Sequence, residues 1–113
     1  MRYIEQTAIN NVTAASNATG PTIDSSFLLF SSTMIIVTGT VTGIVKLQGS
    51  NDYGNSQSNF TPTNWVDIPN ATVTLASANA YIPTTQMCYN WVRVVFVAGG
   101  TGTVTAKFFG QGA

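Results

Sequence analysis

The sequence contains no histidine, and this absence bears first on catalysis. Histidine is the commonest general base, metal ligand and pH switch near neutrality. The single cysteine, Cys88, cannot form a disulfide within the chain or a thiolate zinc site. Its neighbours Met87 and Tyr89 predict a buried, unreactive thiol. We therefore expect a protein that is not an enzyme and that holds no cofactor and no metal.

Charge is the second scarcity. Charged residues make up only 7% of the chain, four basic and four acidic, against roughly 25% in soluble domains. So few basic residues form no stripe that could bind nucleic acid. A net charge of zero favours association, so we expect a surface covered by other protein and a homo-oligomer, such as a trimer. The alternative is a secreted or viral β-domain whose threonine and asparagine side chains interact with solvent.

Long apolar runs are also missing. No run reaches the roughly 18 residues of a membrane span, and the N-terminus lacks the charged-then-apolar order of a secretion signal. We expect no membrane partner and an intracellular origin. The 113 residues are 44% hydrophobic, which excludes a disordered chain and predicts one domain, residues 1–113.

The residues that are present favour strands. Short runs rich in β-branched and aromatic side chains alternate with turn signals at intervals of roughly eight to twelve residues, and helical spacing is nowhere sustained. This pattern predicts an all-β fold: a single antiparallel β-sandwich, jelly-roll-like, with about eight or nine short strands and no significant helix.

The clearest part of this pattern lies near the C-terminus. The runs Trp91–Val97 and Thr103–Phe109 are separated by Ala98-Gly99-Gly100. Because glycine adopts positive φ at little cost, we predict a β-hairpin here. Alternate residues of a strand face opposite sides of the sheet. We assign one face of each run to the core: Val92, Val94, Phe96, Val104, Ala106 and Phe108.

Three other segments are predicted from local signals. Residues 1–9 alternate and form either an edge strand or an arm that pairs with a neighbouring subunit, which makes Tyr3 and Ile4 interaction candidates. Residues 10–21 are small and polar and predict a loop. Pro69-Asn70 predicts a turn, and Pro83 is expected to end the short strand Tyr81-Ile82.

Residues 49–64 are rich in glycine, serine and asparagine and predict a long exposed loop, a kind of segment that often carries function. Its aromatic residues Tyr53 and Phe60 could bind a glycan. The preferred interpretation is that they hold the loop against its own domain or against a neighbour, since interfaces also favour aromatic residues. Trp65 is expected to be a core or interface anchor.

Few charged side chains could carry chemistry. Asp52 and Asp67, with Asn51, could offer oxygen ligands to calcium, but their spacing fits no EF-hand, and Asx turns are the preferred interpretation. Arg93 and Lys46 interrupt apolar strands. They face either solvent or an acidic partner on a neighbouring subunit, with Asp67 as one candidate.

Four segments carry a resemblance: Val45-Lys46-Leu47-Gln48-Gly49-Ser50-Asn51-Asp52, Asn64-Trp65-Val66-Asp67-Ile68, Trp91-Val92-Arg93-Val94-Val95-Phe96 and Gly102-Thr103-Val104-Thr105-Ala106-Lys107. Across residues 38–112 the chain resembles small all-β virion proteins of tailed bacteriophages. The pattern is also similar to discoidin-like sandwiches, although this chain is shorter and has no bracketing cysteines.

The resemblance implies a non-enzymatic virion structural protein, a capsid decoration, cement or tail-associated subunit assembled in the host cytoplasm. Its partners would be other virion proteins, contacted through low-charge β surfaces. The alternative is a carbohydrate-binding or receptor-binding module of a phage tail or fibre that uses the aromatic residues of the 49–64 loop. The interaction candidates are Tyr53, Phe60, Trp65, Arg93, Tyr3 and Ile4.

Overall fold

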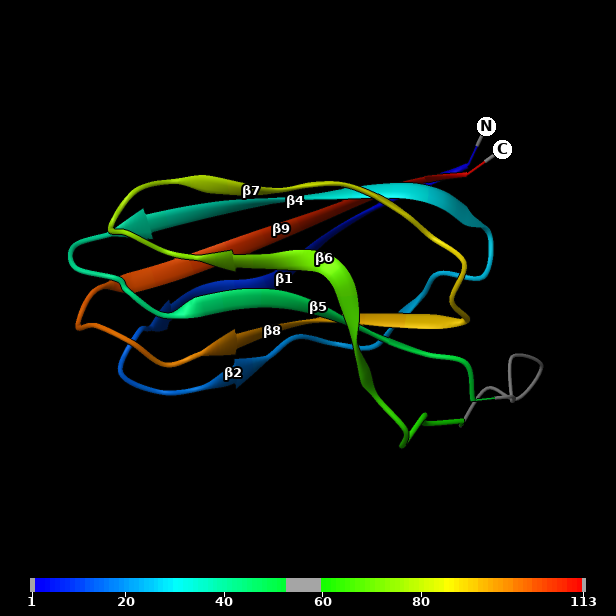
Figure 1. Ribbon diagram of the computed structural model, residues 1–113, viewed down its shortest axis with the longest axis horizontal. Coiled ribbons are helices and arrows are strands. Elements are labelled where there is room, and N and C mark those ends of the chain that lie inside the picture. Colours follow the sequence, from blue (N-terminus) through cyan, green and yellow to red (C-terminus); the bar gives the residue numbers. More distant parts are fainter. Residues whose placement is uncertain (1, 53–59, 113) are drawn as a thin grey trace.

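A computed structural model describes residues 2–52 and 60–112 of the protein. Two antiparallel sheets pack face to face (Figure 1). The described residues form nine strands, β1 (Tyr3–Thr13), β2 (Ala18–Thr19), β3 (Ile23–Asp24), β4 (Leu28–Thr38), β5 (Ile44–Ser50), β6 (Val66–Thr74), β7 (Ala80–Gln86), β8 (Trp91–Val97) and β9 (Thr103–Gly112). Within these residues no helix is long and apolar enough to cross a membrane.

The strand order is that of a jelly roll. Sheet A has the order β1-β9-β4-β7, and sheet B has the order β2-β8-β5-β6, with β3 also paired to β8. Setting β3 aside, the pairs nest along the chain: β5 with β6, β4 with β7, β2 with β8, and β1 with β9. A double-sheet sandwich built by such nesting is the jelly-roll architecture. The predicted fold class is confirmed.

The predicted C-terminal hairpin is wrong, because its two strands lie in different sheets. β8 pairs with β5 in sheet B, whereas β9 pairs with β1 and β4 in sheet A. The connection crosses between the sheets, where Gly99 donates its N–H to the carbonyl of Ala14 and Gly100 bridges to Val41. Of the two glycines expected to have positive φ, Gly100 does, at +104°, and Gly99 does not. The positive φ of Gly100 serves this crossover.

The core assignment for the same strands is confirmed. Val92, Val94, Phe96, Val104, Ala106 and Phe108 are buried between the sheets. The alternating burial of β8 and β9 follows from the period of two along each strand. Alternation therefore identifies which face is buried, but it is the same for a hairpin and for a crossover.

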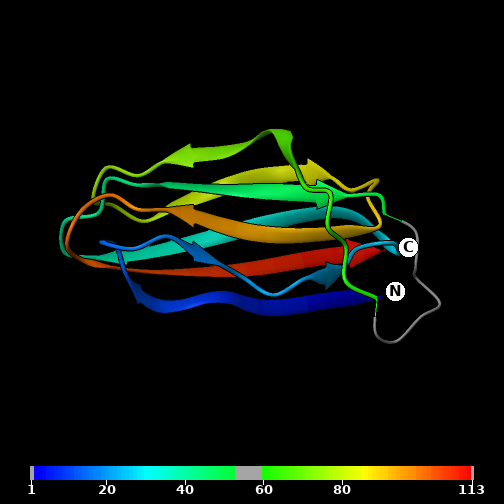
Figure 2. The ribbon, with the colours of Figure 1, turned by 90° about the horizontal axis from the view of Figure 1, so that it is seen from below.

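The N-terminal segment forms an edge strand. β1 runs antiparallel to β9 with Tyr3 opposite Gln111, so both termini lie together at one end of the sandwich (Figures 1 and 2). The predicted loop at residues 10–21 is wrong in part, because β1 continues to Thr13 and residues 18 and 19 form β2. A register shift between Thr7 and Ile9 interrupts the alternation, and Ala8 and Ile9 are both buried.

Both proline predictions need correction. β7 continues past Pro83 to Gln86, with a register shift opposite Ser31–Thr33. β6 continues through Pro69-Asn70 as a bulge. Between the pairs Lys46–Thr72 and Gln48–Asp67, residues 68–71 of β6 stand opposite the single residue Leu47 of β5. Asn70 in this bulge has φ of +61°. β7 and β6 are the edges of their sheets. Proline lacks an N–H, so edge strands and bulges accommodate it.

The burial of three side chains differs from what their type or sequence context suggests. The hydroxyls of Ser31 and Thr33 are buried on β4 without a hydrogen-bond partner among the described residues. Cys88, predicted to be buried, is exposed in the connection between β7 and β8. The apolar neighbour Met87, which suggested burial of Cys88, packs in the core, while Cys88 itself faces outward.

Candidate interaction surfaces

The outer face of sheet A carries one exposed aromatic side chain on each of its four strands. We call this surface the aromatic face and define it by Tyr3 on β1, Phe109 on β9, Phe30 on β4 and Tyr81 on β7. Tyr3 and Tyr81 are 61% and 63% exposed. The rings of Tyr3 and Phe109 stack with centroids 6.0 Å apart. Exposed apolar patches are typical of contact surfaces, which makes this face a candidate.

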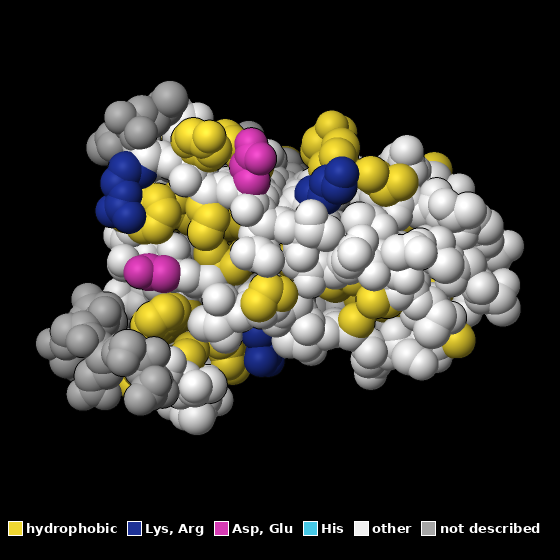
Figure 3. All heavy atoms as spheres, turned by 180° about the vertical axis from the view of Figure 1, so that it is seen from behind, with side chains coloured by type: hydrophobic (Ala, Val, Ile, Leu, Met, Phe, Trp, Pro, Cys, Tyr) yellow, Lys and Arg dark blue, Asp and Glu magenta, His cyan; other side chains and the backbone are white. Residues whose placement is uncertain are grey.

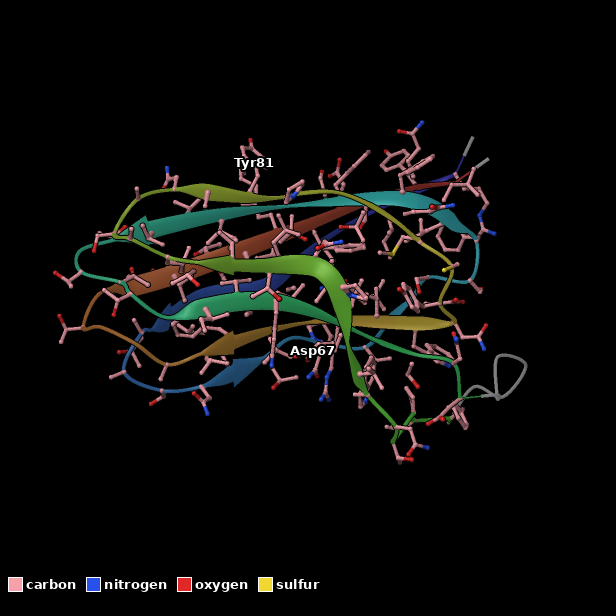
Figure 4. All side chains as sticks on the ribbon, viewed as in Figure 1. Asp67 and Tyr81 are labelled. Atoms are coloured by element: carbon pink, nitrogen blue, oxygen red, sulfur yellow. The ribbon has the colours of Figure 1, made fainter. Side chains whose placement is uncertain are left out.

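A shallow groove of about 460 Å³ runs across the aromatic face. Tyr81 and Phe109 line it together with Met34, and Glu5 and Lys107 supply one charge of each sign. Figure 4 shows Tyr81 pointing outward from β7, while Asp67 lies on the other sheet. The groove therefore joins apolar area to two opposite charges on one sheet face.

The two predicted candidates in β1 do not share a surface. Tyr3 is exposed on the aromatic face, whereas Ile4 is partly buried and packs against the core. Adjacent residues of a strand point to opposite sides. Of this pair, the structure thus places Tyr3 where a partner can reach it.

A polar row crosses the outer face of sheet B. Arg93 on β8, Gln48 on β5 and Asp67 on β6 stand opposite one another in register. Arg93 Nε donates to Gln48 Oε1 at 2.8 Å, and Gln48 Nε2 donates to Asp67 Oδ1 at 2.9 Å. Lys46 Nζ donates to Asp67 Oδ2 at 3.1 Å. The acidic partner considered for Lys46 on a neighbouring subunit is therefore present within the chain.

The two basic side chains of this row, Lys46 and Arg93, both contact partners within the chain. The Arg93 guanidinium lies over the ring of Trp65, with Cζ 4.3 Å from the centroid. The pKa of Asp67 is lowered, first by the hydrogen bond from Gln48 and then by Lys46. This row holds the predicted candidates Trp65 and Arg93 in place on the surface of sheet B.

The predicted exposed loop at residues 49–64 is wrong at its start, because β5 continues through the buried Gly49 and Ser50. Asp52 then links the two ends of the remaining segment. Its Oδ2 accepts the backbone N–H groups of Thr63 at 2.8 Å and Asn64 at 3.0 Å, and its Oδ1 accepts Asn64 Nδ2 at 3.0 Å. Asn51 Oδ1 accepts the N–H of Asn90 at 3.0 Å. These carboxyl and amide oxygens thus bind residues distant in sequence, where Asx turns within the loop were predicted.

The hydrogen bonds around Asp52 favour its ionised form, which holds Thr63 and Asn64 in place. The hydrogen bonds from the Asn64 side chain, then from the N–H groups of Thr63 and Asn64, lower its pKa. Among residues 2–52 and 60–112, no group of three or more acidic, cysteine or histidine side chains could hold a metal ion. Both oxygens of Asp52 already accept hydrogen bonds from the chain.

Of the two aromatic candidates in the 49–64 loop, the structure describes Phe60. Phe60 stacks on Trp91 with centroids 5.9 Å apart, and Trp91 Nε1 donates to the carbonyl of Asp52 at 3.1 Å. Phe60 thus packs against its own domain, one of the two roles considered for it. Tyr53 lies outside the described residues.

The remaining surface carries little charge. Figure 3 shows one face of the molecule on which a few basic and acidic side chains are separated by broad areas of uncharged atoms. With eight charged residues in 113, such a surface loses little favourable charge hydration when a partner covers it.

Sequence reasoning missed Phe30 and Phe109 as contact candidates. A signal was available for Phe109, since the adjacent pair Phe108-Phe109 in an alternating strand must place one ring outside the core. No comparable signal marked Phe30, because the sequence does not show that β4, β7 and β9 are neighbours in one sheet.

Comparisons with known proteins give evidence about the fold of this chain alone. No protein-family model matches the chain, and no curated protein matches it. The crystal structure of the SPBc2 prophage-derived protein YomS is similar with a TM-score of 0.52 and 13% identity, covering 97% of this chain and 95% of that one. A Bacillus endospore appendage structure, described as forming disulfide-linked pili, gives 0.46 and 14%, covering 97% and 88%. At this identity the likeness to YomS concerns the all-β sandwich alone.

Proposed function

We propose that the protein is a non-enzymatic structural subunit of a bacteriophage particle, a capsid decoration or cement subunit that binds other virion proteins. The observation that carries the proposal is the aromatic face, an exposed apolar surface on a chain with very few charges. A partner that covers this face removes apolar area from water and displaces little hydration from charged groups. The prophage origin of YomS, which shares the fold, agrees with a phage setting.

The arrangement of the acidic groups supports a non-enzymatic role. Asp52 and Asp67 have lowered pKa values, whereas a general acid needs a pKa near the working pH. Their hydrogen bonds hold a loop and a strand row together. In this proposal the carboxylates stabilise the base of the loop and the outer face of sheet B, away from the aromatic face.

The alternative, a glycan-binding module built on the 49–64 loop, receives less support. A stacking platform for a sugar requires a free ring face. Phe60 is stacked on Trp91, and Arg93 covers one face of Trp65. The aromatic residues described at this end of the molecule are thus engaged within the chain.

The location of the protein tests the proposal directly. Particles released from cells that carry the gene would be purified on a density gradient and analysed by quantitative mass spectrometry. We expect the chain to co-sediment with the particles in many copies and to be labelled by antibody on their surface in electron micrographs. Its absence from purified particles would overturn the proposal, and specific binding on a glycan array by a particle-free protein would support the alternative.

A further inference from the structure

We propose that the aromatic face joins two copies of this chain, face to face, around a twofold axis that lies in the interface. The inference deepens the proposed function and rests on its premise that the chain acts in an assembly. It names the surface, Tyr3, Phe30, Tyr81 and Phe109, and it names the first partner, a second copy. A dimer thereby takes the place of the trimer expected from the sequence.

Charge complementarity selects this partner. Glu5 and Lys107 both line the groove of the aromatic face. Glu5 stands opposite Phe109 and Lys107 opposite Thr7, so the two charges are diagonal neighbours on adjacent strands. No ion pair joins them; the one found in the described part of the chain is Lys46–Asp67. A face that presents one unpaired charge of each sign is complementary to itself, as a twofold interface requires.

Geometry allows both contacts at once. A twofold axis in the plane of the interface that is perpendicular to the line from Glu5 to Lys107 and passes through its midpoint places each of these residues over the other in the second copy. With strands about 4.8 Å apart and residues about 3.4 Å apart along them, this axis passes close to Phe109. The Phe109 rings of the two copies then meet at the centre, with an ion pair on either side of the axis.

The overlapping area is that of a weak interface. Four strands at about 4.8 Å and roughly ten residues at about 3.4 Å give a sheet face of about 650 Å². Because this axis makes the strands of the two copies cross at about 70°, only about 400 Å² per copy, or about 800 Å² in total, lies in the overlap. Stable interfaces bury about 1,200–2,000 Å² and transient ones less, so we expect a dimer that forms at high protein concentration. The aromatic residues supply the apolar centre that such interfaces need, and the charges fix the register.

Competing partners fit the face less well. Nucleic acid and anionic membranes select surfaces with a clear positive balance, and this face carries one charge of each sign. A second copy matches both the apolar area and the charges.

Charge reversal tests the inference on the purified full chain. We would measure mass by light scattering over a wide concentration range for the natural chain, Glu5→Lys, Lys107→Glu and the double variant. Each single reversal places like charges together across the axis. We expect a dimer for the natural chain, at least about tenfold weaker association for each single variant, and recovery in the double variant.

Controls separate the interface from the fold and from the proposed function. Lys46→Glu makes the same charge change on sheet B and should leave dimerisation unchanged, while Tyr81→Ser should weaken it. Circular dichroism would establish that each variant is folded. A natural chain that stays monomeric, or a double variant that fails to recover, would overturn the dimer. The particle experiment remains independent, since a monomeric chain found in virions would retain the proposed function.

Discussion

The carboxylate of Asp52 accepts the backbone N–H of Thr63 at 2.8 Å, across eleven positions of the chain. This bond closes the predicted 49–64 loop at its base. The same carboxylate also binds Asn64 twice. One acidic residue, interpreted from sequence as part of a turn, is therefore the anchor that sets where the loop begins and ends.

Replacing Asp52 should weaken this anchor in a pH-dependent way. In Asp52→Asn an amide donor faces backbone N–H groups, so we expect a lower melting temperature at neutral pH. Because the folded pKa lies below the ordinary value of 3.8, the stabilisation by Asp52 is present above that value and is lost as pH falls through the folded pKa. Thermal unfolding by circular dichroism at about pH 7 and about pH 2.5 would measure it. An equal difference at both values would contradict the assignment.

Removing the Gln48 side chain should raise the pKa of Asp67. The hydrogen bond from Gln48 is the largest single cause of its lowered pKa, and Lys46 acts through both a hydrogen bond and its charge. We expect an upward shift of the Asp67 pKa in Gln48→Ala and also in Lys46→Met, measured by carbon-13 NMR titration of the carboxyl group. Stability should change little, because exposed polar pairs contribute little. An unchanged Asp67 pKa in Gln48→Ala would show that the row is not formed in solution.

Thr33→Val should stabilise the sandwich. Thr33 is fully buried, and its hydroxyl has no partner among the described residues. Replacing it by a methyl group removes the cost of an unsatisfied polar atom, so we expect a gain of about 1 kcal/mol in urea unfolding. Thr38→Val, on the exposed end of the same strand, is the control and should give no such gain. A loss of stability in Thr33→Val would mean that a buried water binds the hydroxyl.

Val94→Asp should unfold the protein. Val94 is fully buried between the sheets, and an unpaired carboxylate there is expected to cost more than about 3 kcal/mol, a large part of the stability of a small domain. Val95→Asp places the same group on the outer face opposite Lys46 and should remain folded. Circular dichroism and one-dimensional NMR would distinguish the two. A folded Val94→Asp would show that the face assignment is wrong.

Local physics made much of the fold predictable from sequence. A period of two along Trp91–Val97 and Thr103–Phe109 identified the buried faces correctly, because burial of alternate side chains depends on the strand alone. The absence of histidine and the scarcity of charge also predict a protein that is not an enzyme, because composition limits the available chemistry, and this stays a prediction.

What the sequence left open depends on pairs of residues far apart along the chain. Alternation is the same whether β8 turns back on β9 or crosses to the other sheet, so the crossover is decided by the partners β1, β4 and β5. The aromatic face exists because four strands separated in sequence become neighbours. The sequence by itself determined which side chains of the alternating strands β8 and β9 leave water. Only the tertiary structure decided which exposed side chains stand together, because strand order is set by packing of the whole sandwich.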